Sequence, residues 1–208
     1  MKFRELLKKI WNFIWHSNSI WSWIVNIILA FVIIKFLLYP GLGFVMGTSH
    51  PIVAVVSGSM EHDAKFDRWW QSNALCNGDI CSQGEFYAKF NISKSDFLGF
   101  SFKNGFNRGD IIFLKGTSPE KLAVGDVLVF WTGRPDPIIH RVIRKWTENG
   151  NYFFQTKGDH NLKSINSHNL NEAKITSGQI VGKALFRVPY LGWLKIGFVK
   201  LVNLLVGW

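Results

Sequence analysis

The sequence contains few cysteines and few charged residues. Its 208 residues include only two cysteines, too few to hold a domain of this size together as a small disulfide scaffold. Charged residues make up 18% of the chain and hydrophobic residues 48%, so the chain is too apolar to be intrinsically disordered. We therefore expect one compact domain together with apolar segments outside it.

Acidic residues are scarcer than basic ones, 14 against 24, so the net charge is +10. Residues 1–39 hold five basic residues and one acidic residue, and residues 188–208 hold two basic residues and no acidic one. The long middle, 40–187, is nearly balanced, with seventeen basic and thirteen acidic residues. More than half of the excess thus lies in two apolar ends, where basic residues commonly face lipid headgroups. A lipid bilayer is the expected partner, and a nucleic acid is not.

Residues 20–39, which read IWSWIVNIILAFVIIKFLLY, are predicted to form a transmembrane helix. About twenty apolar residues are the length that a helix needs to cross the hydrocarbon core. Within this stretch Asn26 can face a neighbouring helix and Lys35 can extend to the headgroups. Pro40 and Gly41 are expected to end the helix. The alternative is a cleavable signal peptide, but the stretch is long for one and no small-residue cleavage pattern follows it.

The two ends set the expected topology. Residues 1–19 carry one acidic residue, Glu5, against four basic ones, which are Lys2, Arg4, Lys8 and Lys9. The positive-inside rule therefore places the N-terminus in the cytoplasm and the middle of the chain outside. Apolar residues at helical spacing predict that this segment is either an interfacial helix or a cytoplasmic extension of the spanning helix. Residues 188–208 are apolar with two lysines, and we expect a helix that is either a second span or interfacial.

The middle, 40–187, is predicted to be a mostly β domain. Short runs of β-branched and aromatic residues are separated by clusters of Gly, Asn, Asp and Pro. The expected strands are 52–56, 110–114, 126–131, 138–143, 152–156 and 179–186. Residues 61–108, rich in Phe, Asn, Lys, Ser and Gly, interrupt this pattern and are interpreted as an insertion.

The insertion contains both cysteines. Cys76 and Cys81 favour a local disulfide in an extracytoplasmic domain, with free thiols or a metal site as the alternatives. The chain's histidines are not spaced as zinc pairs, so we interpret four of them as surface residues and expect no metal or cofactor; they are His50, His62, His160 and His168. Asn91-Ile92-Ser93 is an N-glycosylation sequon, usable only outside a cell that glycosylates.

Three polar groups interrupt or end apolar strands. Ser59 lies in Ser57-Gly58-Ser59-Met60 after the first strand, His140 lies inside IIHRVI, and Asp159 lies in Lys157-Gly158-Asp159-His160-Asn161 after the strand YFFQT. A serine at a strand end can present its hydroxyl, a histidine can accept the proton near neutral pH, and a carboxylate can orient the histidine. Together they are candidates for a nucleophile, a base and an orienting acid.

The sequences of these segments and their order along the chain resemble those of the signal peptidases of archaea and the endoplasmic reticulum, the Ser-His type of signal peptidase I. The matching boxes are SGSME at 57–61, VGDVLVF at 124–130, IIHRVI at 138–143 and TKGDHN at 156–161. The closing segment IVGKALFRVPYLGW is also similar. The resemblance covers about residues 20–60 and 108–195 and misses the insertion.

This resemblance implies an extracytoplasmic β domain, tethered to the cell membrane, that removes signal peptides from exported preproteins. Ser59 would be the nucleophile, His140 the general base and Asp159 the orienting acid. The backbone N–H of Ser59 and the hydroxyl of Ser57 would bind the oxyanion. Preproteins and protein-export machinery would be partners, and no cofactor is implied.

One departure from the family pattern leaves alternatives open. A second aspartate usually follows about six residues after the first, and here Ile165 or Asn166 stands in that place. Either Asp159 orients His140, or Asn166 does so by a hydrogen bond without a countercharge. A Ser-Lys dyad with a lysine base, Lys145 or Lys157, is another alternative. At the level of function, the alternatives are a membrane-anchored peptidase of another substrate class and a non-catalytic β binding module.

Overall fold

The computed structural model describes residues 2–206, so Met1 and the last two residues of the predicted C-terminal segment, 207–208, lie outside the described residues. The chain divides into two compact units, one up to Val45 and one from Met46 onward. The first unit is helical, and the second contains the sheet.

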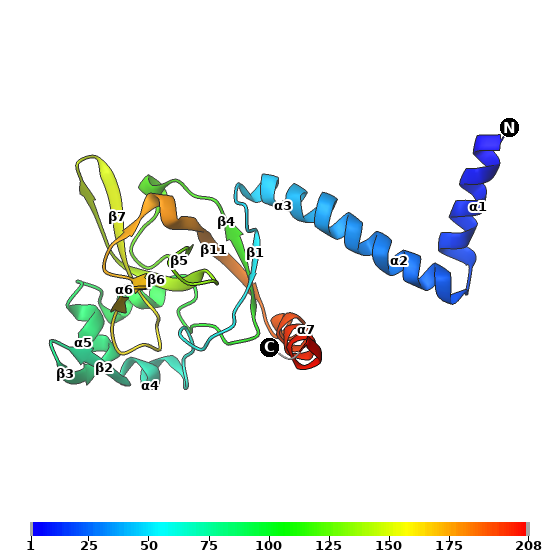
Figure 1. Ribbon diagram of the computed structural model, residues 1–208. Helices are drawn as coiled ribbons and strands as arrows, with labels where there is room; N and C mark the ends of the chain where they lie inside the picture. The colour runs from blue at the N-terminus through cyan, green and yellow to red at the C-terminus, as the bar shows by residue number, and fades with distance from the viewer. Residues whose placement is uncertain (1, 207–208) are drawn as a thin grey trace. The chain divides into compact units, whose positions relative to one another are not determined.

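The first unit contains a long apolar helix (Figure 1). It runs through α2 (Ile20–Ile33), a π-helical segment (Ile34–Leu38) and α3 (Tyr39–Met46). The prediction that Pro40 and Gly41 end the helix is therefore wrong. The π-helical turn ends two residues before Pro40, where the missing N–H and the ring of proline disturb regular α-helical hydrogen bonding. The 27 residues Ile20–Met46 are long and apolar enough to cross a membrane, by length and composition alone.

A separate helix, α1 (Lys2–His16), precedes this segment. Three residues, 17–19, interrupt the helical conformation, and the Ser19 side chain caps α2 by accepting from the N–H of Trp21. Asn26 donates its side-chain N–H to the carbonyl of Ile14 at 2.9 Å, and Ser22 donates to the carbonyl of Phe13. The polar residue inside the apolar stretch thus bonds to a neighbouring helix, as expected, and α1 is not a continuous extension of α2.

The second unit is built on a seven-stranded antiparallel sheet with the order β1-β4-β11-β5-β6-β7-β10. The mostly β fold is confirmed, and each of the six predicted strands is present. The strands of this sheet are β1 (Ile52–Ala54), β4 (Ile111–Lys115), β5 (Val127–Phe130), β6 (Ile138–Glu148), β7 (Asn151–Lys157), β10 (Ile175–Thr176) and β11 (Ile180–Val188). A separate two-stranded ribbon joins β8 (Asn166–Ser167) to β9 (Leu170–Asn171), and short 3₁₀ turns form at Pro119–Lys121 and Ser177–Gln179.

Alternation along the strands places apolar side chains in two clusters within the sheet domain. One cluster packs Val55 and Met60, which flank the Ser57–Ser59 turn, against β4 and β5 through Ile112, Leu114, Val127 and Val129. The other joins Leu128 and Phe130 of β5 to Val142, Phe154, Leu170 and Ile175. Both ends of the turn that carries Ser59 are therefore fixed by buried side chains.

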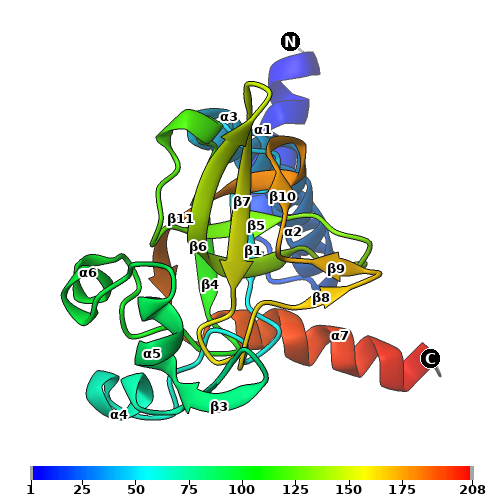
Figure 2. The same ribbon diagram turned by 90° about the vertical axis from the view of Figure 1, so that its left-hand side faces the viewer.

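The insertion forms a small subdomain with its own aromatic core. It contains α4 (Phe66–Trp70), a hairpin of β2 (Asn73–Cys76) and β3 (Asp79–Ser82), α5 (Gln83–Ala88) and α6 (Lys94–Gly99), which gather beside the lower end of β7 in Figure 2. Its core packs against Ile143 of β6, through Trp69, Trp70, Phe86, Tyr87, Ile92 and Phe97. Cys76 and Cys81 form a disulfide across the hairpin, which confirms the favoured interpretation.

The last helix of the described residues is α7 (Gly192–Val206), with 15 residues. Its first turn is bonded to the turn before β4, where Gly192 donates its N–H to the carbonyl of Gly109 at 2.8 Å. The rest of the helix exposes large apolar side chains, among them Leu194, Phe198, Leu201 and Leu204.

Candidate active site

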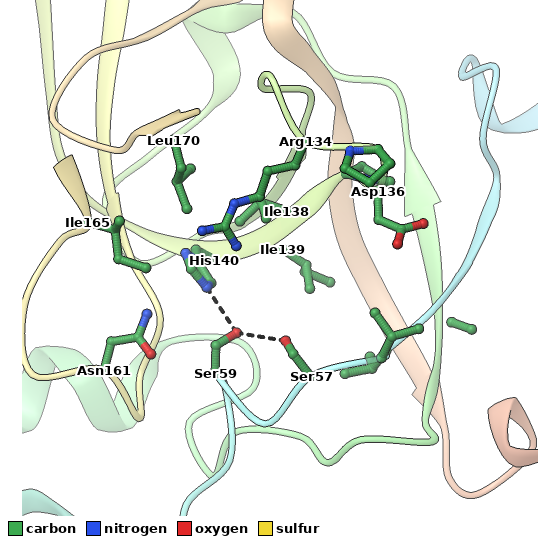
Figure 3. Close-up of a pocket in the computed structure, with 15 residues that line it drawn as sticks. Ser57, Ser59, Arg134, Asp136, Ile138, Ile139, His140, Asn161, Ile165 and Leu170 are labelled. Atoms are coloured by element: carbon green, nitrogen blue, oxygen red, sulfur yellow. Dashed lines mark hydrogen bonds between the residues drawn. The ribbon is translucent and has the colours of Figure 1, made fainter. Parts of the chain in front are cut away.

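Ser59 lies in the turn that follows β1, and its hydroxyl points toward β6 (Figure 3). Ser59 Oγ is 2.9 Å from Nε2 of His140. Met60, the next residue, is 1% exposed and anchors the turn in the core. The structure thus brings together the predicted nucleophile and the predicted base, which are 81 residues apart in the sequence.

His140 is held in the middle of the sheet. It lies on β6 opposite Leu128 of β5, and only 3% of its surface is exposed. The other ring nitrogen, Nδ1, contacts a carboxylate oxygen of Glu172. A carboxylate accepts hydrogen bonds and cannot donate when ionised, so this contact places the proton of the neutral ring on Nδ1. Nε2 is then free to accept the proton of the Ser59 hydroxyl.

Glu172 was not among the residues predicted from the sequence. It lies between β9 and β10 and is fully buried. No family box contains it, because it lies between the box TKGDHN at 156–161 and the closing segment IVGKALFRVPYLGW. One signal in the sequence could have identified it, since Glu172 is the only acidic residue between Asp159 and the end of the chain.

The predicted contact between Asp159 and His140 is wrong. The two carboxylate oxygens of Asp159 accept from Nε and Nη2 of Arg141 at 2.9 and 2.7 Å. Tyr87 donates its hydroxyl to Asp159 at 3.0 Å, and Nε2 of His62 lies 3.2 Å away. The physical reason is alternation, because His140 and Arg141 are consecutive on a strand and point to opposite faces of the sheet. Asp159 lies on the face of Arg141.

The surroundings of Asp159 fit an ion pair. Burial alone would raise the pKa of this carboxyl, but the charge of Arg141 and the hydrogen bonds from His62 and Arg141 outweigh it, so the pKa lies below its ordinary value. The interpretation of His62 as a surface residue is also wrong, since its side chain is 2% exposed and stacks on Trp69 with ring centroids 3.6 Å apart. Asp159 is thus placed as a structural partner of a buried arginine.

The other candidates for the third role and for the base lie elsewhere. Asn166 is exposed on β8 and pairs with Asn171. Lys145 donates to the carbonyls of Glu120 and Leu122. Lys157 is fully buried and donates to Oε1 of Gln83 at 2.8 Å and to nearby carbonyls. Burial lowers the pKa of Lys157 to about 7, although Asp159 and Glu172 act in the opposite direction.

A cleft of about 340 Å³ opens beside Ser59 and His140. One wall is residues 54–57 at the end of β1, and the other is the loop Arg134–Pro137 with the start of β6. Apolar side chains from β6 and the segment after β7 line it, among them Ile138, Ile139, Ile165 and Leu170 (Figure 3). The hydroxyl of Ser57 lies at the same place, with its Oγ 3.3 Å from Oγ of Ser59.

Within residues 2–206 the structure contains no group of three or more His, Cys, Asp or Glu side chains placed to hold a metal ion. Ser59, His140 and Glu172 join a hydroxyl, an imidazole and a carboxylate in sequence by hydrogen bonds at the edge of an apolar cleft. This is the order in which a nucleophile, a base and an orienting acid are arranged.

Comparison with known proteins gives relatives of one kind. The human and mouse proteins named signal peptidase complex catalytic subunit SEC11C are each 33% identical to this chain over 102 residues, which cover 48% of this chain and 53% of the relative. The protein named signal peptidase complex catalytic subunit SEC11 of Colletotrichum graminicola is 25% identical over 184 residues, covering 82% of this chain and 83% of the relative. No family model matches the sequence.

The matched segment spans about half the length of the mammalian relatives. The resemblance to the ER-type signal peptidase I family is nevertheless confirmed, because this chain has homologues named as catalytic subunits of signal peptidase complexes.

Proposed function

We propose that this protein is a membrane-tethered serine endopeptidase that removes signal peptides from exported preproteins. The observation that carries the proposal is the 2.9 Å contact between Ser59 Oγ and His140 Nε2 at the edge of an apolar cleft. The homologues named signal peptidase complex catalytic subunit support the choice of substrate.

The proposed reaction is acyl transfer. The Ser59 hydroxyl attacks the scissile carbonyl while His140 Nε2 accepts its proton, and a covalent acyl-enzyme forms as the peptide bond breaks. His140 then returns the proton to the leaving amine. A water molecule, deprotonated by the same nitrogen, attacks the ester and releases the acyl product.

The oxyanion is stabilised by two donors next to the nucleophile. One donor is the backbone N–H of Ser59, which belongs to the same residue as the attacking hydroxyl. The other is the side-chain hydroxyl of Ser57, whose Oγ lies 3.3 Å from Ser59 Oγ. Because Ser57 Oγ is exposed in the cleft, it can turn from Ser59 Oγ toward a substrate oxygen.

The preprotein binds as an added strand. β1 is the terminal strand of the sheet and, among residues 2–206, pairs with β4 alone, so its other edge offers backbone groups to an added strand. An extended segment along this edge lies in the cleft between residues 54–57 and the loop Arg134–Pro137. Small side chains before the cut, which the family resemblance implies, suit an extended chain passing close to Ser59.

The proposed location is the cell membrane, with the β domain on the extracytoplasmic side. The segment Ile20–Met46 is long and apolar enough to span, and basic residues dominate the chain before it. The disulfide Cys76–Cys81 suits an oxidising compartment. Protein-export machinery is a proposed partner.

The direct test is cleavage of a preprotein by the purified full chain in detergent or nanodiscs. We expect a single cut after a residue with a small side chain at the end of the signal peptide, and sequencing of the new N-terminus identifies this cut. The Ser59→Ala variant should make no cut. Cleavage at unrelated sites would favour a membrane-anchored peptidase of another substrate class. Binding of the preprotein without cleavage would favour a β binding module.

A further inference from the structure

We propose that Glu172 is the positioning residue for His140 and occupies the role left open by the missing second aspartate. The inference rests on the proposed function for its catalytic readout, but the geometry stands by itself. Glu172 Oε1 contacts His140 Nδ1, the nitrogen opposite to the one that faces Ser59. The glutamate is fully buried, so the contact is shielded from water.

The carboxylate of Glu172 is fixed by two further donors. The backbone N–H of Ile165 donates to Oε2 at 2.7 Å, and the hydroxyl of Thr156 donates to Oε1 at 3.0 Å. Ile165 stands where the family pattern leads one to expect an acid, so that segment here supports the carboxylate with its backbone. The side chain that aligns the imidazole is therefore itself held in one orientation.

The backbone of Glu172 is fixed in the same way. Its N–H donates to the carbonyl of Ile165 at 2.9 Å, and its carbonyl accepts from the N–H of Thr156 at 3.0 Å. Residue 172 is thus joined to the end of β7 and to the segment that follows it. These bonds place a carboxylate from the β9–β10 connection on the face of the sheet to which His140 points.

This geometry makes a specific prediction about the proton on His140. All three partners of the Glu172 carboxylate are donors, so an ionised carboxylate matches each of them. Replacing it with the amide of Glu172→Gln forces the NH₂ group to face either Ile165 N–H or His140 Nδ1. The second arrangement reverses the tautomer, so that Nε2 carries the proton and cannot accept one from Ser59.

The experiment compares Glu172→Gln and Glu172→Asp with a matched control, Asp110→Asn. Asp110 is a second buried carboxylate, 1% exposed, that accepts from backbone N–H groups of Asn107 and Tyr190 and does not touch His140. For preprotein cleavage we expect kcat to fall about 10⁴-fold in Glu172→Gln, with little change in KM. This is the size of the loss in kcat when the carboxylate of a catalytic triad is changed to an amide. Glu172→Asp should recover part of the loss, and Asp110→Asn should keep kcat.

A spectroscopic readout separates positioning from stability. The tautomer of His140 can be measured by ¹⁵N NMR of the histidine rings, and the signals that disappear in His140→Ala are assigned to His140. These signals should show the Nδ1–H tautomer in the wild type and a shift toward the Nε2–H tautomer in Glu172→Gln.

The proposal is overturned if Glu172→Gln keeps the His140 tautomer and a kcat within about threefold of the wild type, or if Asp110→Asn loses activity equally. If the wild type cleaves no preprotein, the proposed function fails, and the NMR comparison still decides whether Glu172 sets the state of His140.

Discussion

His140 and Arg141 are neighbours on β6 that use two different carboxylates. His140 faces the cleft and Glu172, whereas Arg141 faces Asp159 and the insertion. The guanidinium is fully buried and also donates to the carbonyls of Ser101, Phe102 and Gly125. Removing one partner from such a buried pair typically costs about 3 to 5 kcal/mol, because a charge is left without compensation. Asp159 therefore contributes to stability next to the site.

The site has no room for a side chain at Gly158. A Cβ at this position would lie 2.8 Å from Nε2 of His140 and 2.7 Å from the carbonyl of Ser59. We predict that Gly158→Ala lowers kcat about 10²-fold or more by displacing the base from the nucleophile. Gly178→Ala is the control, since nothing lies within 4 Å of its added Cβ. Equal cleavage rates in the two variants would contradict the close packing around His140.

Lys157 should give the stability of the protein a distinctive pH dependence. Its pKa is lowered by burial from the ordinary 10.5 to about 7, so between these values the unfolded chain binds more protons than the folded chain. The free energy of unfolding should therefore rise with pH in this window, by at most about 1.4 kcal/mol per pH unit. In Lys157→Met this contribution is absent. Urea unfolding at pH 7 to 9 checks it, and parallel pH curves for both proteins would contradict it.

The sequence predicts Ser57, Ser59 and His140 correctly as neighbours because each ends or interrupts a recognisable strand. It fails for the acid for two reasons. First, the direction of the Asp159 side chain in the turn after β7 depends on its ion pair with Arg141. The sequence around Asp159 does not reveal this ion pair. Second, Glu172 reaches His140 only because the β8–β9 ribbon and the pairing of β10 with β7 bring residue 172 back to the sheet. These strand pairings are tertiary contacts, which the local sequence around Glu172 does not predict.

At the scale of elements, the insertion is connected to the end of β7 and to the loop after it by three side chains from two of its parts. Tyr87 and Gln83 of α5 bond to Asp159 and Lys157, and His62 approaches Asp159 from the start of the insertion. Burial, followed by the charge of Asp159, raises the pKa of Tyr87 well above its ordinary value, so the phenol stays a donor. The insertion therefore supports the loop that packs behind Ser59 and His140.

Tyr87→Phe tests this connection between the insertion and the loop. The variant keeps the ring in the aromatic core but removes one hydrogen bond to a buried carboxylate, so we predict a loss of about 1.5 to 3 kcal/mol in the free energy of unfolding. Tyr152→Phe is the control, because the Tyr152 hydroxyl makes no hydrogen bond to any of residues 2–206. Chemical denaturation measures both, and an equal stability of the two variants would contradict the role of Tyr87.

The elements of the sheet are largely predictable from the sequence, because a run of β-branched and aromatic residues bounded by turn residues marks each of the six predicted strands. The helix that continues past Pro40 is not, since a π-helical turn at Ile34–Leu38 accommodates the proline. The helices of the insertion are also missed. They are only five or six residues long and owe their stability to the shared aromatic core more than to local propensity.

For the whole molecule, the proposed function requires the β domain and the N-terminus on opposite sides of the membrane. With Cys76 and Cys81 replaced by serine, we predict that Gly133→Cys reacts with an impermeant thiol reagent added outside intact cells. Arg4→Cys should react only after the membrane is opened. Both positions are exposed in their own units, so accessibility reports topology. The reverse labelling pattern would place the β domain in the cytoplasm, away from exported preproteins.

The central claim is that Ser59 and His140 act as one catalytic unit. The most direct measurement is the rate of preprotein cleavage by Ser59→Ala, His140→Ala and the double variant, with melting temperatures recorded for each. We predict that each single variant falls to the background rate and that the double variant is no slower, because removing either half of a nucleophile–base pair removes the whole effect. Substantial cleavage by either single variant in its folded state would contradict the account.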